Sequence, residues 1–284
     1  MKKILCPVDF SKTSTKAIDY AVHIAQRAGG HLSLMHVIHI PVVDTSDTAL
    51  VANELLDEQM HDAGEKLKAL IQFVEEKHGA NRGGGFTCNY ILEEGLLTDL
   101  AERLCKVDGY DLIVMGTTGL SSPLEELFVG SNTEAVVEEV NCAVLSIPAN
   151  AQFADIEKII YASDYSAEDK YALNEVVGFG SLFGAPIDVV HVVKERTAAS
   201  TTKANEFWQE LNEDYHDVPM QFQEVVSKHR DEGLKNYYKE ANGSVLAVVR
   251  KEKGFLQELF SKSLAERMTY QADVPLLVLH GRKS

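Results

Sequence analysis

In the first half of this chain, segments with the hydrophobic pattern of buried strands alternate with segments that have the pattern of amphipathic helices. Short apolar runs at 4–8, 32–38, 86–92, 111–115 and 143–147 are typical of buried strands. Between them, apolar residues recur every three or four positions at 13–28, 47–78, 96–105 and 131–140, which predicts amphipathic helices. Strands that alternate with helices favour a parallel sheet wound right-handed and covered on both faces. We therefore predict an open five-stranded α/β fold for residues 1–149.

Helix boundary signals agree with this pattern. Ser11 follows the first strand and can cap the helix that starts at Thr13. Gly29 and Gly30 follow the last apolar position of that helix and are expected to end it. Loops are expected at 41–45 and in the glycine-rich link at 81–85.

The pattern starts again after a short polar linker at 148–153. Residues 156–166 echo residues 1–11, and His36-Val37 recurs as His191-Val192, both at an offset of 155. Residues 124–128 recur as 256–260, and 144–147 as 276–279, both at an offset of 132. Two constant offsets in the correct order indicate a duplication with about 23 residues lost from the second copy, mainly at the long second helix, whose counterpart is 198–215. We predict two tandem domains, 1–149 and 155–284.

Charge and composition narrow the classes of partner. The net charge of −16 disfavours non-specific binding to nucleic acid or to an anionic membrane surface. No apolar run reaches the roughly 18 residues of a spanning helix, and the N-terminal run is broken by Asp9, too early for a signal peptide. The cysteines, Cys6, Cys88, Cys105 and Cys142, are scattered without a Cys-x-x-Cys pair, as expected for reduced, mostly buried thiols in a cytoplasmic protein.

The stretch from Met115 to Thr133 carries the candidate chemistry. An apolar run at 112–115 leads into Gly116-x-x-Gly119, and Gly130-Ser131 opens the next helix. Glycines let a backbone approach a ligand closely, and a helix start offers free N–H groups and a favourable dipole to an anion. Ligands of open α/β sheets bind beyond the carboxyl ends of the strands. The stretch is therefore a candidate phosphate cradle, although it is not a P-loop because no Gly-Lys-Ser/Thr occurs.

These residues resemble the universal stress protein family, over the whole chain as a tandem pair. The family's fold is a five-stranded parallel α/β sheet, Rossmann-like and related to the adenine nucleotide alpha hydrolases. Its nucleotide-binding branch has Gly-x2-Gly-x9-Gly-Ser/Thr after the fourth strand. Here Gly116-x2-Gly119 and Gly130-Ser131 resemble that motif with ten residues between. Pro7-Val8-Asp9 and Met35-His36-Val37 resemble the ends of the family's first two strands.

The resemblance implies a site for ATP or a related adenine nucleotide, with Mg²⁺ as a companion ion. By analogy, Asp9 and the backbone of Val37 line the adenosine site, and the glycine loop with Gly130-Ser131 holds the phosphates. The full set of expected binding residues is Pro7, Val8, Asp9, Val37, Met115, Gly116, Thr117, Gly119, Gly130, Ser131, Asn132 and Thr133.

The second half lacks this cradle. Residues 250–255 follow the apolar run at 245–249 without Gly-x-x-Gly, and Lys262-Ser263 stands in place of Gly130-Ser131. We interpret this half as a degenerate copy with a structural or interaction role. By analogy with dimers of the family, strands 144–147 and 276–279 are expected to pair within one chain as a built-in pseudo-dimer. A further homodimer is left open.

Two other interpretations of these residues are left open. The glycine stretch can be only a turn and a helix cap, and Asp9 only a turn carboxylate, in an interaction protein that binds no nucleotide. A slow nucleotide hydrolase is the other alternative, with Asp9 as the one candidate base near the phosphates. His36 and His39 lack ligand spacing, and the cysteines lack a histidine and acid partner, so we predict neither a metal site nor a catalytic residue.

Overall fold

The computed structural model describes residues 1–39, 49–83, 85–117, 131–250 and 274–280. Its contacts divide the chain into two compact units. The first contains Met1–Gly116 and Ser131–Cys142, and the second contains Thr117 and the chain from Ala143 onward. Among the described residues, no helix combines the length and the apolar character that crossing a membrane requires.

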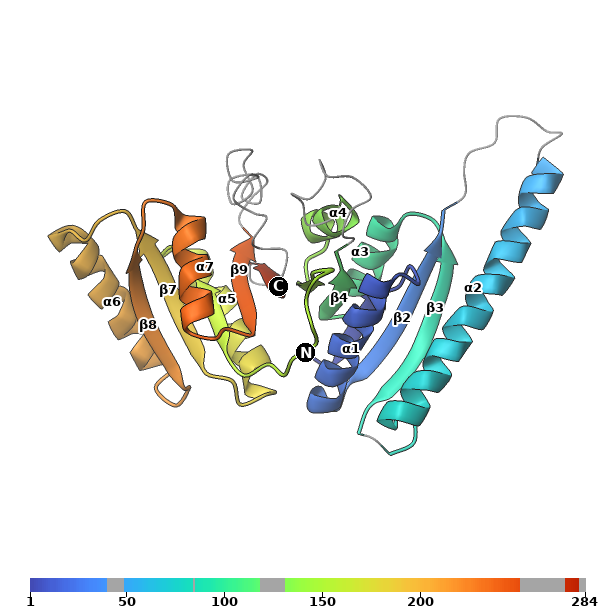
Figure 1. Ribbon diagram of the computed structural model, residues 1–284, viewed down its shortest axis with the longest axis horizontal. Coiled ribbons are helices and arrows are strands. Elements are labelled where there is room, and N and C mark those ends of the chain that lie inside the picture. The colour runs from blue at the N-terminus through green and yellow to red at the C-terminus, as the bar shows by residue number, and fades with distance from the viewer. Residues whose placement is uncertain (40–48, 84, 118–130, 251–273, 281–284) are drawn as a thin grey trace. The chain divides into compact units, whose positions relative to one another are not determined.

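The first unit is a parallel sheet of four strands covered by helices (Figure 1). Its elements are β1 (Lys3–Pro7), α1 (Lys12–Ala28), β2 (His31–Ile38), α2 (Ala49–His78), β3 (Thr87–Glu94), α3 (Leu97–Val107), β4 (Leu112–Gly116) and α4 (Ser131–Glu139). The strand order is β3-β2-β1-β4. α1 and α2 advance across the sheet in one direction and α3 returns, so right-handed crossovers place α3 on the opposite face. Fully buried Ile4, Leu32 and Leu112 lie in the sheet core.

The ends of α1 confirm the predicted boundary signals. Ser11 is the N-cap, and its hydroxyl accepts a hydrogen bond from the Ser14 N–H at 3.1 Å. Gly29 ends the helix at φ 57°, in the left-handed region that glycine occupies without a Cβ penalty. These caps fix where the chain turns back to form β2.

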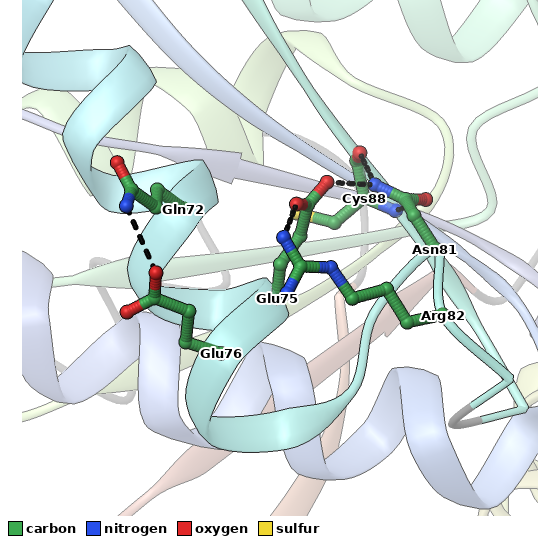
Figure 2. A network of polar contacts seen from close by, with 6 residues as sticks. All are labelled: Gln72, Glu75, Glu76, Asn81, Arg82 and Cys88. Atoms are coloured by element: carbon green, nitrogen blue, oxygen red, sulfur yellow. Dashed lines mark hydrogen bonds and ion pairs between the residues drawn. The ribbon is translucent and has the colours of Figure 1, made fainter.

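A polar network holds the connection between α2 and β3 (Figure 2). The Asn81 side chain donates to the Glu75 carboxylate at 2.9 Å and to the Cys88 carbonyl at 2.8 Å, and it accepts from the Cys88 N–H at 3.0 Å. Arg82 donates to Glu75 at 3.2 Å. Asn81 adopts φ 57°, which asparagine tolerates better than most residues. The side-chain amide of Asn81 therefore pairs with both the N–H and the carbonyl of Cys88, as a neighbouring strand would.

The second unit repeats the design. Its elements are β5 (Ala143–Ile147), β6 (Ile159–Ala162), α5 (Ala167–Ser181), β7 (Ile187–Val193), α6 (Ala198–Asp214), β8 (Met220–Val226), α7 (Arg230–Glu240), β9 (Val245–Arg250) and β10 (Leu276–His280). Strands β10, β9, β6, β7 and β8 are parallel neighbours in that order. β5 pairs with β10 in the antiparallel direction, with Leu277 opposite Leu145. The predicted pairing of these two strands is confirmed.

Strand registers confirm the internal repeat. Ile4 faces Leu112 in the first unit, and Ile159, which is Ile4 at offset 155, faces Val245 in the second. The counterpart of Gly116 is therefore Val249, and that of Thr117 is Arg250. The second helices differ most, because α2 has 30 residues and α6 has 17. The difference of 13 residues (30 against 17) is more than half of the about 23 residues lost, so the deletion falls mainly in this helix, as predicted.

Candidate functional site

Three strands of the first unit end at one edge of the sheet. Pro7 is paired with Met35, and Leu5 of β1 is opposite Ile113, two residues before the buried Met115 of β4. Because the strands are parallel, Asp9, which follows β1, lies at the same edge of the sheet as Val37, the second-last residue of β2, and Gly116, the last residue of β4. β1 lies between β2 and β4, where the chain order reverses, and this is the switch point at which open α/β sheets bind ligands.

Asp9 is an exposed carboxylate in a tight turn after β1. Its Oδ1 accepts a hydrogen bond from the Ser11 N–H at 2.9 Å. Burial alone would raise the pKa of Asp9, but hydrogen bonds from Ser11 and Ser14 outweigh it and lower the pKa below its ordinary value. Asp9 is therefore a fixed negative charge at neutral pH. Asp9 is thus a turn carboxylate, as the simpler interpretation expects, and its exposed position leaves it accessible to a ligand.

An aromatic residue and a histidine brace this turn. The Val8 N–H donates to the Met35 carbonyl at 2.7 Å, and the His36 Nδ1–H donates to the Val8 carbonyl at 2.6 Å. Since a carbonyl only accepts, Nδ1 of His36 carries a proton. Phe10 adopts φ 62°, a rare conformation for an aromatic residue, and its ring lies 4.6 Å from the His36 ring. His36 thus holds the strand end in place.

Gly116 is needed for helix packing. A Cβ at this position would lie 2.8 Å from both Cγ2 and the carbonyl oxygen of Thr13. The absence of a side chain lets the first turn of α1 approach the end of β4. Its φ lies outside the left-handed region, so close approach is the reason for glycine here. The contact brings the turn of Asp9 and the start of the glycine stretch together.

The structure describes three of the remaining residues that the sequence predicts to bind the nucleotide with its phosphates, Thr117, Asn132 and Thr133, and the start of α4 at Ser131. Thr117 donates its N–H to the Ile147 carbonyl at 2.9 Å, and its hydroxyl donates to the same oxygen at 3.3 Å. α4 begins at Ser131, as predicted, with Asn132 exposed and Thr133 buried in its first turn. Gly119 and Gly130 lie outside the described residues.

The second unit builds the same turn from equivalent positions. Asp164 Oδ1 accepts from the Ser166 N–H at 3.2 Å, and Tyr165 has φ 63°. His191 Nδ1 donates to the Ser163 carbonyl at 2.8 Å. Burial lowers the pKa of His191, so this ring is neutral at physiological pH. Each of these residues is its first-unit counterpart moved by 155 positions.

Aromatic side chains gather beyond the second turn. The Tyr165 ring stacks on His191 at 3.9 Å between centroids, and it lies 4.9 Å from Phe207 of α6 and 6.0 Å from Phe222 of β8. Trp208 stacks against Phe222 at 6.3 Å. Phe207 and Leu211, four residues apart on one face of α6, are both buried. In the second unit, packed aromatic rings therefore lie at the edge of the sheet that is equivalent to the edge where Asp9 is exposed in the first unit.

A buried carboxyl group lies beneath the second turn. Asp169, which is fully buried, accepts hydrogen bonds from the Tyr161 hydroxyl and the Ser163 hydroxyl, both at 2.6 Å, and from the Asp164 N–H at 3.2 Å. Burial raises the pKa of Asp169 more than these hydrogen bonds lower it. The first-unit counterparts of Tyr161 and Asp169 are Cys6 and Ser14, so this network belongs to the second unit alone.

Some of these features were not predicted from the sequence. The braces Phe10–His36 and Tyr165–His191 were missed, although an aromatic residue and a histidine that recur together at offset 155 are a readable signal. Within the described ranges, no group of three or more His, Cys, Asp or Glu side chains has the arrangement of a metal site.

Comparison with known proteins assigns both halves of the chain to one family. The model of the Universal stress protein family matches residues 1–148 and again 155–280. Universal stress protein Slr1230 of Synechocystis is 27% identical over 207 residues, which cover 68% of this chain and 71% of that protein. Universal stress protein YxiE of Bacillus subtilis is 30% identical over 148 residues, which are 51% of this chain and 97% of that protein.

A solved structure extends the likeness to the full length. A universal stress protein of Archaeoglobus fulgidus superimposes with a TM-score of 0.71 at 16% identity, covering 98% of this chain and 96% of that one. At this identity the match shows the fold, with its two consecutive α/β halves.

Proposed function

Because the chain belongs to the universal stress protein family, we propose that its first half binds ATP or a related adenine nucleotide and that the protein acts as a stress-response binding protein. In this proposal, family domains occupy 1–149 and 155–284. The first holds one nucleotide at the ends of β1, β2 and β4. The second is a structural or interaction copy without a nucleotide.

The observation that carries this proposal is the arrangement around Asp9. An ionised, exposed carboxylate stands at the switch point of the sheet, beside the start of the glycine stretch. A carboxylate accepts hydrogen bonds from ribose hydroxyls, and the neighbouring backbone of Val37 belongs to the adjacent strand end. In this proposal, the glycine at position 130 and the free N–H groups of the first turn of α4 would bind the phosphates.

A magnesium ion fits this set only as a companion of the nucleotide. Mg²⁺ is held in proteins by one or two carboxylates together with substrate phosphates and water. Asp9 is the one carboxylate among the proposed binding residues, so the phosphates would have to provide further ligands. The ion would neutralise phosphate charge, and Asp9 would supply an anionic oxygen at the strand end.

Paired variants of the two halves test the proposal. We expect calorimetry with Mg-ATP to detect binding by the wild-type chain. Asp9→Asn should weaken it roughly 10- to 100-fold, because a charge-assisted hydrogen bond contributes about 1.5–3 kcal/mol. Asp164→Asn, the equivalent change in the second half, should leave the affinity unchanged. The proposal is wrong if the wild type shows no binding at millimolar nucleotide, or if the two variants weaken binding equally.

A further variant separates the glycine stretch from a purely structural role. Gly130→Lys copies Lys262 of the second half and adds a Cβ and a long side chain where phosphate should approach. We expect loss of binding with the thermal midpoint within a few degrees of wild type. Unchanged affinity in a folded variant would favour the turn-and-cap reading.

A further inference from the structure

Two half-buried cysteines that are far apart in sequence meet in the first unit. Cys105 lies in the last turns of α3, and Cys142 lies between the end of α4 and the start of β5. Their sulfur atoms are 2.6 Å apart although the residues are 37 positions apart in the chain. A covalent S–S bond measures about 2.05 Å, so only a small movement separates the two thiols from a disulfide.

We propose that Cys105 and Cys142 are a redox-modification site, at which a peroxide converts the two thiols into a reversible intramolecular disulfide. The bond would join α3 to the segment that follows α4. The site shares no residue with the proposed nucleotide site, and it is built entirely from side chains of the first unit.

The two sulfurs are joined by a hydrogen bond. This hydrogen bond, together with burial, raises the pKa of the Cys142 thiol well above its ordinary value. Either sulfur can be the donor in the hydrogen bond, so either thiol can make the first attack on an oxidant. Both residues are partly exposed, so a small oxidant can reach the pair from solvent.

The chemistry balances with hydrogen peroxide as the oxidant. The thiolate of one cysteine attacks one peroxide oxygen, an S–O bond forms, the O–O bond breaks, and the departing hydroxide takes the proton that this thiol has lost to become water. The sulfur of the other cysteine then attacks the sulfenic sulfur. The S–S bond forms, the S–O bond breaks, and hydroxide leaves with the proton of the second thiol as a second water. Two thiols lose two electrons, and one peroxide becomes two waters.

The other two cysteines of the chain provide an internal contrast. Cys6 and Cys88 are buried in the sheet, and burial raises the pKa of Cys88 to about 12 and that of Cys6 still further. Such thiols are protonated at neutral pH and are shielded from a dissolved oxidant. The second unit has tyrosines, Tyr237 and Tyr238, in the corresponding turn of α7 and Val274 before β10, so it has no equivalent pair.

Peptide mapping of the full-length chain tests the proposal. The protein is incubated with hydrogen peroxide, denatured in excess alkylating reagent and digested. We expect two of the four cysteines to escape alkylation and the Cys105 and Cys142 peptides to appear joined, two hydrogens lighter than their sum. A dithiol reductant should restore all four alkylated sites. Oxidation of each cysteine separately to sulfinic or sulfonic acid, or four free thiols after peroxide, would overturn the proposal.

Single variants identify the pair. Cys105→Ser and Cys142→Ser should each abolish the linked peptide, whereas Cys88→Ser, a matched change at a buried position of the same unit, should leave it intact. A linked peptide that survives Cys105→Ser or Cys142→Ser would contradict the assignment. The wild-type map needs no variant, so the test stands even if a substitution impairs folding.

Discussion

The turn after the first strand has the same construction in both halves, but its surroundings differ. Asp9 and Asp164 each accept from the N–H two residues on, and Phe10 and Tyr165 share a left-handed φ. His36 and His191 each donate to the carbonyl at the strand end. Duplication has thus kept the backbone device that orients the carboxylate. The surroundings of the turn have changed, because packed aromatic rings lie around Tyr165, whereas Asp9 is exposed.

The two halves differ in two ways at this edge. Gly116 of the first half lets α1 approach the end of β4, whereas its counterpart Val249 in the second half carries a buried side chain. In addition, Phe207 and Phe222 pack around Tyr165 in the second half. A shared motif therefore does not define a site by itself. What lies beyond the strand ends decides whether a ligand has room and a cradle.

The largest expected effect concerns the buried carboxyl group of the second half. Asp169→Ala removes the acceptor of both the Tyr161 and Ser163 hydroxyls, which leaves buried donors unpaired. We expect a loss of about 3 kcal/mol in the free energy of unfolding of the second unit. Urea denaturation measures it. Ser14→Ala, at the equivalent position of the first half, should cost about 1 kcal/mol or less. Equal losses from both variants would contradict the view that this network belongs to one half.

The next effect tests why Gly116 is glycine. Gly116→Ala places a methyl group 2.8 Å from Thr13, and we expect a destabilisation of about 1–3 kcal/mol. Gly178→Ala is the control, because a Cβ there meets no atom within 4 Å and the residue lies inside α5. That variant should gain up to about 1 kcal/mol in helix propensity. Thermal and urea unfolding would refute the packing explanation if Gly116→Ala were as stable as wild type.

The smallest effect is a pH dependence confined to the second half. Burial raises the pKa of Glu175 to about 7, whereas its first-half counterpart is the buried Tyr20. The folded state therefore holds the Glu175 proton more tightly than the unfolded state. Its contribution to stability is present below about pH 4.5 and is lost as pH rises to about 7.

Glu175→Gln measures this contribution. The variant should lose the decline between these pH values and should be more stable than wild type at pH 8 by about 1 kcal/mol, a figure discounted for the side chain's partial exposure. Unfolding free energies across pH 4–8 provide the comparison. A wild-type decline that persists unchanged in the variant would assign the pH dependence to another group.

Periodicity was sufficient to predict the fold. The alternation of apolar runs with amphipathic stretches indicated each strand and helix of the first half, and the two offsets predicted the repeat. The pairing of β5 with β10 followed from family analogy and is confirmed. The structure sets the third strand at Thr87–Glu94, slightly beyond the predicted range, because its pairing with β2 continues to Ile38 opposite Glu94.

The site was less accessible to sequence reasoning. Asp9 and Gly116 were identified from the motif, but the packing reason for Gly116 depends on Thr13, a contact that periodicity does not reveal. A left-handed φ at Phe10 contradicts its residue preference and is imposed by the turn. The meeting of Cys105 and Cys142 depends on how α3 and α4 pack, so two scattered cysteines gave no warning of it.

Under the proposed function, each chain has one nucleotide site, located in its first half. Equilibrium dialysis of the full-length protein against labelled Mg-ATP counts the sites directly. We predict one nucleotide bound per chain at saturation, and none for Gly130→Lys. Two nucleotides per chain, or one that survives Gly130→Lys and is lost in Asp164→Asn, would contradict the claim.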